Sequence, residues 1–366
     1  MSKLLIFIPS IEDGGVEKNL FLISDYLIEK GIHVSLITAN QDKKKFFNKK
    51  INFISPHNSY WSTRGRFLKT IACFYLLLKF YFRNNNFLIL SFQANIYAIF
   101  FSIILNIKII TRSNTAPKGW SSNFIKRHIF KIFFRFPKSI IVNSLEFKKQ
   151  LDNEFKIKSN CIYNPFNEKT VKIKSQKKIF FDFFKKKNTI NIINIGRMTD
   201  QKDQILILKA LNNLKNKINF KCLILGKGSN YLKLNNFIID NNLKNKVKLS
   251  GFKSNPYPYI KMANLFILSS RYEGLPNVLL EAQYLKKFII STNCPTGPKE
   301  ILLNGKAGKL IEVGNQKQLE QAIVYYNNNI GGSKINNKIS YGKSNMKRFN
   351  FETNCFKYYK LIKKFI

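Results

Sequence analysis

The sequence predicts an α/β protein made of two units, the first of them Rossmann-like. The length of 366 residues, 45% of them hydrophobic, fits two units of about 150 to 180 residues, each with its own apolar core. In the first half, short apolar runs alternate with helical patterns, as in a parallel sheet. Each half also opens on a strand, a glycine-bearing turn and an amphipathic stretch.

The first half begins with an apolar strand at residues 4–8. A turn that contains Gly14 and Gly15 follows, and an amphipathic helix begins at about Val16. Because the chain runs straight into this strand, no signal peptide is evident and we expect a mature, cytoplasmic start. Five strands are predicted in this half: 4–8, 33–38, 87–91, 107–112 and 139–143.

Two apolar segments of the first half are too short or too charged to be membrane spans. Residues 66–82 are interrupted by Lys69 and Lys79, so a buried helix of the domain is predicted. Residues 96–110 are interrupted by Lys108 and are predicted to be a helix and a strand that meet at Asn106.

Residues 122–138 combine Lys and Arg with many Phe and Ile. Two interpretations stay open for this segment. It is a basic amphipathic helix that lies in the plane of lipid headgroups, or a helix that packs on the core and exposes its charges to water. Residues 167–187, rich in Lys and Phe, are predicted to be a linker between the two halves.

The formal net charge of +42 points to an anionic partner. Nucleic acid is not expected, because the basic residues are spread along the chain and no helix-turn-helix, zinc finger or RNA-binding signature accompanies them. The bias toward Lys, Asn, Ile and Phe, with few Arg, is also that of an AT-rich coding sequence. An anionic membrane surface or a lipid-diphosphate acceptor is the preferred partner, because each surface Lys or Arg contributes about 1 kcal/mol there.

The cysteines and histidines do not predict a disulfide framework or a metal site. The five cysteines are scattered without a CxxC pair, and there are only three histidines. Neither a disulfide framework nor a zinc site is therefore predicted.

The most informative stretch is SSRYEGLPNVLLEA at residues 269–282. It places Glu273 before a predicted helix start near Pro276 and Glu281 inside that helix. The N–H groups and positive dipole of the helix end attract an anion, and Gly274 lets main chain approach it closely. The two carboxylates are suited to accepting hydrogen bonds from sugar and ribose hydroxyls. This combination predicts half of a nucleotide-sugar site.

Arg197 and Lys202 follow another predicted strand, residues 190–195, and precede a helix from about Asp203. In open α/β sheets, ligands bind outside the carboxyl ends of the strands. Two cations at that place can clamp a diphosphate. Since only nine of the 62 basic residues are Arg, an Arg directly after a strand-ending Gly196 favours a bidentate role.

These motifs together resemble a known family. GRMTDQK at 196–202, LGKGS at 225–229, EGLPNVLLEA at 273–282 and CPTGPKEIL at 294–302 are similar to the C-terminal half of the retaining GT-B glycosyltransferases of the large fourth family. IPSIEDGGVEKNL at 8–20 resembles the glycine-rich first loop of that family, so the resemblance covers nearly the whole chain. The Glu-to-Glu motif with the upstream Arg and Lys is fairly specific, whereas the glycine pairs alone are weak signals.

The resemblance implies a GT-B fold, in which two Rossmann-like domains with parallel sheets face each other across a cleft. The acceptor domain is expected at 1–170 and the donor domain at 188–340. The terminal segment, about 341–366, is expected to cross back to the first domain.

The resemblance also implies an activity. It is the transfer, with retention, of a hexose or N-acetylhexosamine from a nucleotide diphosphate sugar, by default a UDP-sugar, to a saccharide or lipid-linked acceptor in the biosynthesis of capsule, O-antigen or lipopolysaccharide. Arg197, Lys202 and Glu273 are the expected catalytic residues, because the two cations stabilise the leaving diphosphate. The sequence contains no Asp-x-Asp triplet, so neither a metal nor another cofactor is expected.

Further roles are implied for residues around the donor. Glu281 accepts from the ribose hydroxyls, Glu273 with the backbone of 274–276 holds hydroxyls of the sugar, and Phe252 stacks on the base. The expected donor-binding residues are Gly14, Gly15, Gly196, Arg197, Lys202, Phe252, Glu273, Gly274, Leu275, Pro276, Asn277 and Glu281.

The acceptor side departs from the family. Many relatives have a His near the transferred sugar, whereas the comparable run SFQAN at 91–95 offers Gln93 and Asn95. Arg112 and Asn114, at the end of a first-domain strand, are expected to meet the acceptor. Two other functions stay open: a noncatalytic protein that binds nucleotide sugars or polyanions, and a GT-B epimerase or phosphorylase.

Overall fold

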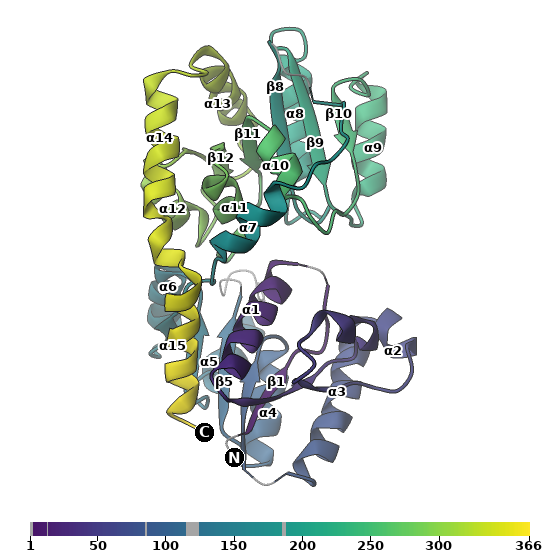
Figure 1. Cartoon of the computed structure of the whole chain (residues 1–366), viewed down its shortest axis with the longest axis vertical. Coiled ribbons are helices and arrows are strands. Elements are labelled where there is room, and N and C mark those ends of the chain that lie inside the picture. The colour runs from purple at the N-terminus through teal and green to yellow at the C-terminus, as the bar shows by residue number, and fades with distance from the viewer. Residues whose placement is uncertain (1–2, 13, 85, 115–123, 185–187) are drawn as a thin grey trace. The chain divides into compact units, whose positions relative to one another are not determined.

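The computed structural model describes residues 3–12, 14–84, 86–114, 124–184 and 188–366. The chain divides into two compact units (Figure 1). Unit 1 contains Met1–Pro165 and Phe351–Ile366, and unit 2 contains Phe166–Asn350. Among the described residues, no helix is both long and apolar enough to cross a membrane.

Unit 1 is built on a seven-stranded parallel sheet with the order β3-β2-β1-β4-β5-β6-β7. The central strand β1 pairs with β2 on one side and β4 on the other, so that Lys3 lies opposite both His33 and Phe87. The strand order therefore reverses between β1 and β4. The strands are β1 (Lys3–Phe7), β2 (His33–Ile37), β3 (Asn52–Ile54), β4 (Phe87–Ser91), β5 (Ile109–Ser113), β6 (Ser139–Val142) and β7 (Asn160–Cys161).

Helices cover both faces of this sheet because its strands are apolar on both sides. One face packs on α1 and α15, with Tyr26 of α1 in edge-to-face contact with Phe351 of α15 at 5.9 Å between ring centroids. The other face packs on α3, α4, α5 and α6. The helices are α1 (Gly15–Glu29), α2 (Tyr60–Thr63), α3 (Arg66–Tyr81), α4 (Asn95–Ile104), α5 (Phe124–Phe133), α6 (Leu145–Phe155) and α15 (Phe351–Lys363), with a 3-10 turn at Gln41–Phe46.

The five strands predicted in the first half are confirmed, and the helix and strand predicted within 96–110 are α4 and β5, with Asn106 between them at φ 50°. The short edge strands β3 and β7 were not predicted. For residues 66–82 the prediction is half right. One side of α3 is buried by Cys73 and Leu77, but its outer side exposes Phe67 and Tyr75.

Residues 122 and 123 of the predicted amphipathic segment lie outside the described residues. Residues 124–133 form α5, in which Phe130 and Phe133 pack against the core while Ile125 and Ile129 are exposed, and residues 134–138 are not helical. This helix thus has apolar residues on both its inner and its outer side.

Unit 2 is built on a six-stranded parallel sheet with the order β10-β9-β8-β11-β12-β13. Its strands are β8 (Ile190–Ile195), β9 (Phe220–Leu225), β10 (Val247–Leu249), β11 (Leu265–Leu268), β12 (Phe288–Thr292) and β13 (Lys309–Ile311). Its helices are α7 (Glu168–Ser175), α8 (Gln204–Leu214), α9 (Tyr231–Asp240), α10 (Tyr257–Met262), α11 (Asn277–Tyr284), α12 (Pro298–Ile301), α13 (Gln316–Asn328) and α14 (Ser333–Ser344), with 3-10 turns at Leu303–Gly305 and Asn345–Phe349.

The boundaries between the units differ from the predicted ones. The chain enters unit 2 at Phe166, and the first part of the predicted linker forms α7, which contacts α10. The amide of Asn255 also donates to the carbonyl of Lys174 at 2.9 Å. The chain returns to unit 1 at Phe351 rather than near 341, because α14 packs against α11 within unit 2. The predicted linker therefore belongs to unit 2, and the returning segment is shorter than expected.

Arg112 on β5 lies inside unit 1 and is only 1% exposed. Its Nε donates to the hydroxyl of Tyr358 on α15 at 2.8 Å, and its Nη2 donates to Oδ1 of Asn164 at 2.8 Å. No partner is found for its Nη1 among the described residues. The guanidinium also lies over the ring of Phe92 at 5.2 Å. Arg112 therefore ties the returning helix α15 to the sheet through neutral partners.

Replacing Tyr358 with Phe is expected to destabilise unit 1 by about 1–3 kcal/mol, because a buried charged donor loses its acceptor without a change of shape. Urea unfolding checks this value. Tyr359→Phe is the control, since the neighbouring Tyr359 is only half-buried, and it is expected to change the free energy of unfolding by less than about 0.5 kcal/mol. Equal losses in the two variants would contradict the role given to the Tyr358 hydroxyl.

Candidate functional site

The residues of unit 2 that were predicted to bind a donor gather at one edge of its sheet, whereas Gly14 and Gly15 lie in unit 1. All six strands are parallel, so the loops that follow them emerge at the same edge. The strand order reverses between β8 and β11, and ligands of open α/β sheets bind at such a switch point. The loops at 196–203 and 269–276 flank this point.

Lys202 and Glu273 meet across the switch point. Nζ of Lys202 lies 2.5 Å from Oε1 of Glu273, and the two side chains are 16% and 8% exposed. The hydroxyl of Ser270 donates to the same carboxylate oxygen at 2.6 Å. Both residues were predicted, but not their ion pair. Oε1 of Glu273 accepts from both Lys202 and Ser270. In this structure Glu273 therefore orients the ammonium group of Lys202.

The stem of Lys202 crosses Gly196. A Cβ added to Gly196 would lie 3.5 Å from Cδ and Cγ of Lys202, an ordinary van der Waals contact, so the stem runs directly along this part of the backbone. The hydroxyl of Ser269 donates to the carbonyl of Lys202 at 2.8 Å. The N–H of Arg271 also donates to the carbonyl of Gln201 at 2.8 Å. The two loops at the switch point are thus joined by their main chains as well as by the ion pair.

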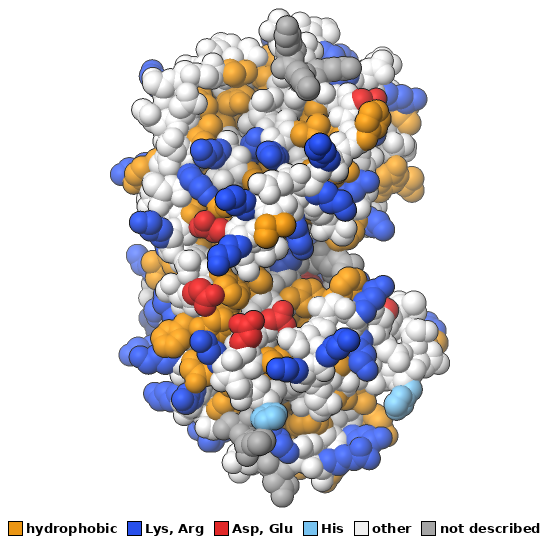
Figure 2. Space-filling model, in the orientation of Figure 1, with side chains coloured by type: hydrophobic (Ala, Val, Ile, Leu, Met, Phe, Trp, Pro, Cys, Tyr) orange, Lys and Arg blue, Asp and Glu red, His pale blue; other side chains and the backbone are white. Residues whose placement is uncertain are grey.

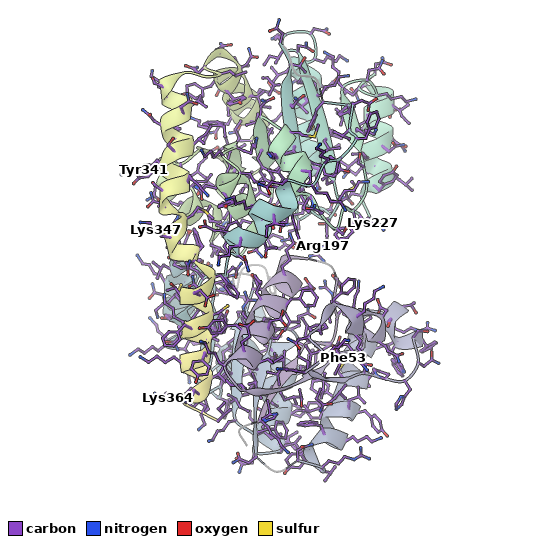
Figure 3. The ribbon with its side chains drawn as sticks, in the orientation of Figure 1. Phe53, Arg197, Lys227, Tyr341, Lys347 and Lys364 are labelled. Carbon is purple, nitrogen blue, oxygen red and sulfur yellow. The ribbon has the colours of Figure 1, made fainter. Side chains whose placement is uncertain are left out.

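Arg197 is exposed at the start of its loop. Its carbonyl accepts from the amide of Gln204 at 3.0 Å, which anchors the backbone while the side chain faces outward. The next residue, Met198, donates its N–H to the carbonyl of Lys227 at 2.8 Å. Lys227 is itself exposed, and Figure 3 shows it at the same end of unit 2 as Arg197. Lys227 was not among the predicted residues, although the LGKGS motif pointed to its loop.

Close contacts between backbones explain two glycines of that loop. A Cβ on Gly226 would lie 1.9 Å from the carbonyl oxygen of Gly196, and a Cβ on Gly228 would lie 2.2 Å from that of Met198. Both glycines also have a positive φ, 151° and 159°. The loop after β9 therefore packs directly on the loop after β8, as only glycine permits.

The start of α11 is shaped by a third loop. The helix begins at Asn277 with Pro276 as its N-cap, close to the predicted position. The hydroxyl of Thr296 donates to the carbonyl of Glu273 at 2.8 Å. A Cβ on Gly297, where φ is 55°, would lie 1.7 Å from the carbonyl oxygen of Gly274. The 293–297 loop therefore fixes the path of 273–276, and its Thr and Gly were not predicted.

Glu281 is buried in α11 and is only 3% exposed. The hydroxyl of Tyr257, at the start of α10, lies 3.4 Å from its Oε1. Phe252 follows β10 in a neighbouring loop and its ring is partly exposed. The carbonyl of Gly251 beside it accepts from the N–H of Gly226 at 2.8 Å. The loop that carries Phe252 is therefore hydrogen-bonded to the loop after β9, which in turn packs on the loop that carries Arg197.

Cys294 lies beside the ion pair. Burial, together with the nearby Glu273 carboxylate, raises the pKa of its thiol to about 12. At neutral pH this cysteine is therefore a packed thiol and not a thiolate nucleophile.

The predicted roles in unit 1 fit less well. Oε2 of Glu17 accepts from the N–H of Gly14 at 2.9 Å, and Oε1 accepts from the N–H of Glu12 at 3.0 Å. The carboxylate is buried and caps α1 from within. A Cβ on Gly14 would lie 2.9 Å from Oε2, so this glycine makes room for Glu17. The N–H of Gly14 is therefore taken up by Glu17, and Gly15 is the first residue of the capped helix. That these two glycines bind the donor stays a prediction.

Arg112 and Asn114 do not form the exposed acceptor site that was predicted. Arg112 is buried against α15, because its guanidinium is taken up by Tyr358 and Asn164. The amide of Asn114 donates to the carbonyl of Phe92 at 2.9 Å. This hydrogen bond links the segments that follow β4 and β5. The residues that follow it, 115–123, lie outside the described residues.

Gln93 and Asn95 lie near the switch point of the unit 1 sheet. Oε1 of Gln93 accepts from the N–H of Ser10 at 3.2 Å, which links the loops after β1 and β4. Oδ1 of Asn95 accepts from the hydroxyl of Ser91 at 2.8 Å. In this structure both side chains therefore form hydrogen bonds within and between the loops after β1 and β4.

Comparison with known proteins finds similarity in the unit that carries the Lys202–Glu273 ion pair. Residues 175–342 match the family model described as "Glycosyl transferases group 1". The matched residues all lie in unit 2. An uncharacterized glycosyltransferase of Methanocaldococcus jannaschii is 37% identical over 180 residues, which is 47% of this chain and only 44% of that protein.

Two further similar proteins extend over both units. An N-acetylgalactosamine-N,N'-diacetylbacillosaminyl-diphospho-undecaprenol 4-alpha-N-acetylgalactosaminyltransferase of Campylobacter jejuni is 27% identical over 340 residues, 88% of this chain and 89% of that protein. The crystal structure of Anabaena Alr3699/HepE in complex with UDP-glucose covers 100% of both chains with a TM-score of 0.80 and 18% identity. At that identity the likeness establishes the fold. The two parallel-sheet units thus have the GT-B architecture that the motifs predicted.

Proposed function

We propose that the chain transfers a hexose or N-acetylhexosamine, with retention, from a nucleotide diphosphate sugar to a saccharide or lipid-linked acceptor during polysaccharide biosynthesis. The observation that carries the proposal is the Lys202–Glu273 ion pair at the switch point of the unit 2 sheet, within the matched family segment. UDP is the first nucleotide to test, because a structure of the same fold holds UDP-glucose.

The chemistry follows from where charge develops. When the bond between the anomeric carbon and the diphosphate breaks, the leaving diphosphate keeps the electron pair and gains negative charge. Lys202, held in place by Glu273 and Ser270, and the exposed Arg197 offer fixed positive charge to that group. The acceptor hydroxyl oxygen then bonds to the anomeric carbon, and its proton passes to an oxygen of the leaving diphosphate.

Other residues of the site bind and orient the donor in this proposal. Glu281 accepts from the ribose hydroxyls and Phe252 stacks on the base. The backbone of 274–276 faces the hydroxyls of the sugar. Because the cations supply the positive charge, we propose turnover without a divalent metal. Unit 1 is proposed to bind the acceptor, and the protein is proposed to work in the cytoplasm, attached peripherally to the inner face of the cytoplasmic membrane.

Thermal unfolding of the full chain tests the donor site. The melting temperature is measured with UDP, GDP, ADP, CMP and their common sugar conjugates, in EDTA and then with Mg²⁺. Bound ligand raises the melting temperature by mass action, so a shift with one nucleotide in EDTA is the expected result. The same shift should be lost in Glu281→Ala. A shift that appears only with Mg²⁺ would refute metal independence.

Product analysis then separates the proposed transfer from other activities. Release of the nucleoside diphosphate only in the presence of acceptor is expected. Donor binding without turnover would indicate a nucleotide-sugar binding protein. An isomerised sugar would indicate an epimerase, and a sugar phosphate would indicate a phosphorylase.

A further inference from the structure

The outer sides of α3, α4 and α5 are apolar although they face water. On α3, Phe67 and Tyr75 are each 66% exposed, and Ile71 between them is also exposed. On α4, Tyr97 and Ile104 are exposed in the same way. Soluble monomers rarely leave many large apolar side chains of neighbouring helices uncovered, so this surface requires a partner.

The exposed side chains form one surface because the three helices lie side by side. They pack on the same face of the unit 1 sheet. Phe74 of α3 stacks on Phe101 of α4 at 4.0 Å between centroids and touches Tyr97 at 6.5 Å. Phe100 of α4 in turn contacts Phe133 of α5 at 6.4 Å. We call the exposed side of these three helices the outer apolar face.

The charge of this part of the chain is of one sign. From residue 43 to residue 145 the sequence contains no Asp or Glu, but 18 Lys or Arg. All three helices come from that stretch. Figure 2 shows one side of the whole molecule, on which Lys and Arg are spread among apolar side chains, with Asp and Glu in fewer places. A partner for the outer apolar face must therefore be apolar and anionic at once.

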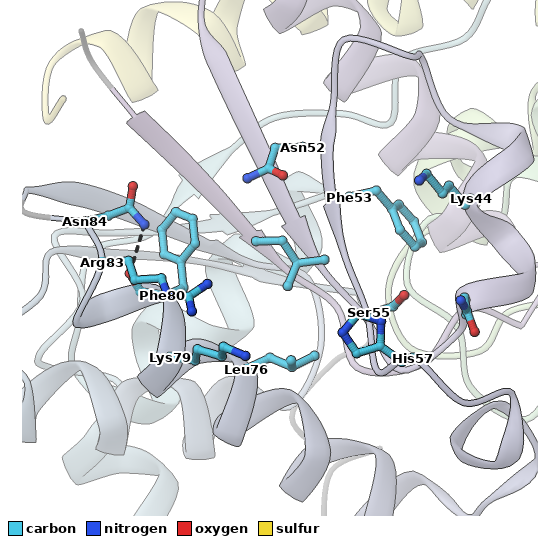
Figure 4. Close-up of a pocket in the computed structure, with 12 residues that line it drawn as sticks. Lys44, Asn52, Phe53, Ser55, His57, Leu76, Lys79, Phe80, Arg83 and Asn84 are labelled. Atoms are coloured by element: carbon cyan, nitrogen blue, oxygen red, sulfur yellow. Dashed lines mark hydrogen bonds between the residues drawn. The ribbon is translucent and has the colours of Figure 1, made fainter.

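A cationic pocket lies beside the face. It has a volume of about 450 Å³, and its lining includes Lys44, His57, Lys79 and Arg83 but no carboxylate (Figure 4). Lys79 and Arg83 belong to α3 and its C-terminal end, on the side next to Tyr75, because residues four apart are neighbours on a helix. The pocket is large enough for a phosphate headgroup next to the apolar side chains.

We propose that the outer apolar face docks on an anionic phospholipid bilayer, with lipid phosphate held by the cationic pocket. Aromatic and aliphatic side chains surrounded by Lys and Arg are the composition of interfacial membrane-binding surfaces. A second copy of the chain fits less well, because a symmetric dimer would press together two faces that both come from a stretch rich in Lys and Arg, although Glu12 and Glu154 pair with its arginines Arg66 and Arg127. The inference concerns membrane attachment and not transfer, so vesicle binding is measured without nucleotide sugar and fails or succeeds independently of turnover.

Flotation of the full chain with vesicles tests the proposal. Vesicles of phosphatidylcholine alone are compared with vesicles that contain about 30% phosphatidylglycerol. Binding to the anionic vesicles is expected, and in the variant Phe67→Ser, Ile71→Ser, Tyr75→Ser it should fall about tenfold or more. The control variant Tyr231→Ser, Leu232→Ser, Ile239→Ser removes comparably exposed side chains of α9 in unit 2 and should bind like the wild type.

A second pair of variants tests the pocket. Lys79→Gln with Arg83→Gln should weaken binding to anionic vesicles more than Lys233→Gln with Lys244→Gln, which removes the same charge from exposed positions of unit 2. The single variant Tyr75→Ser, with a smaller expected loss, is the check if the triple variant does not fold.

Three results would overturn the proposal. The first is no binding of the wild type to anionic vesicles. The second is equal binding by the wild type and the Phe67, Ile71, Tyr75 variant. The third is a dimer in sedimentation velocity that this variant abolishes, because a second copy would then cover the face.

Discussion

Replacing Lys202 with Met is expected to lower kcat by about 10²- to 10³-fold, the usual cost of removing one preorganised group that stabilises developing charge. The loss should appear in kcat more than in KM, because the leaving diphosphate gains its charge in the transition state. Initial rates over a range of donor concentrations measure both constants. Lys209→Met, at an exposed position of α8, is the control and should leave both constants unchanged.

The same replacement also leaves the carboxylate of Glu273 buried without its cation. Part of the effect could therefore be structural. The double variant Lys202→Met, Glu273→Gln separates the two contributions, because it removes the unpaired charge while Ser270 remains to hydrogen-bond the amide. We expect the double variant to recover the melting temperature but not kcat. Recovery of turnover as well would show that Lys202 has no catalytic role.

Replacing Gly297 with Ala is expected to abolish donor binding and to destabilise unit 2 by on the order of 3 kcal/mol or more. The new Cβ would lie 1.7 Å from the carbonyl oxygen of Gly274, at a φ of 55° that alanine also disfavours. Backbone must therefore move at the start of α11, where the sugar and diphosphate are proposed to bind. Thermal unfolding with and without UDP measures both effects.

Gly314→Ala is the matched control for this substitution. Gly314 has a positive φ of 75°, but nothing lies within 4 Å of an added Cβ. The control therefore has only the strain of a left-handed residue, about 1–2 kcal/mol, and should keep the UDP shift. If Gly297→Ala keeps that shift too, the 293–297 loop does not shape the donor site.

The place of the candidate donor residues in unit 2 could be predicted from the sequence largely because its signals are local. Arg197 and Lys202 follow one strand within a few residues, and Glu273 and Glu281 flank one helix start. The ion pair between Lys202 and Glu273 could not be predicted in this way. It joins residues 71 positions apart, and their meeting depends on β8 and β11 being neighbours in the sheet.

The roles of two side chains in unit 1 were missed, for two different reasons. The role of Glu17 could have been predicted, because Gly14 and Glu17 have the spacing of a capping box. The inward direction of Arg112 could not, because its partner Tyr358 is 246 residues away. Position at a strand end alone therefore did not distinguish a ligand-binding arginine from a buried one.

The exposure of one side of α3 could not be predicted from its amino-acid composition. A helix with apolar residues all around is normally buried, and the sequence of 66–82 has that character. The structure leaves only part of it covered, because α3 lies over one side of a sheet with no further layer above it among the described residues. The helix itself was therefore predicted correctly, but its complete burial was not.

The route of the backbone sets an order of events during synthesis. Unit 2 is formed by one uninterrupted stretch, Phe166–Asn350, whereas unit 1 needs α15 in addition to its first 165 residues. Until α15 leaves the ribosome, the core face that it covers is open and Arg112 lacks the Tyr358 hydroxyl. The unit whose translation begins first is therefore the one completed last, and a nascent chain carries an unfinished apolar surface for the whole time that unit 2 is being made.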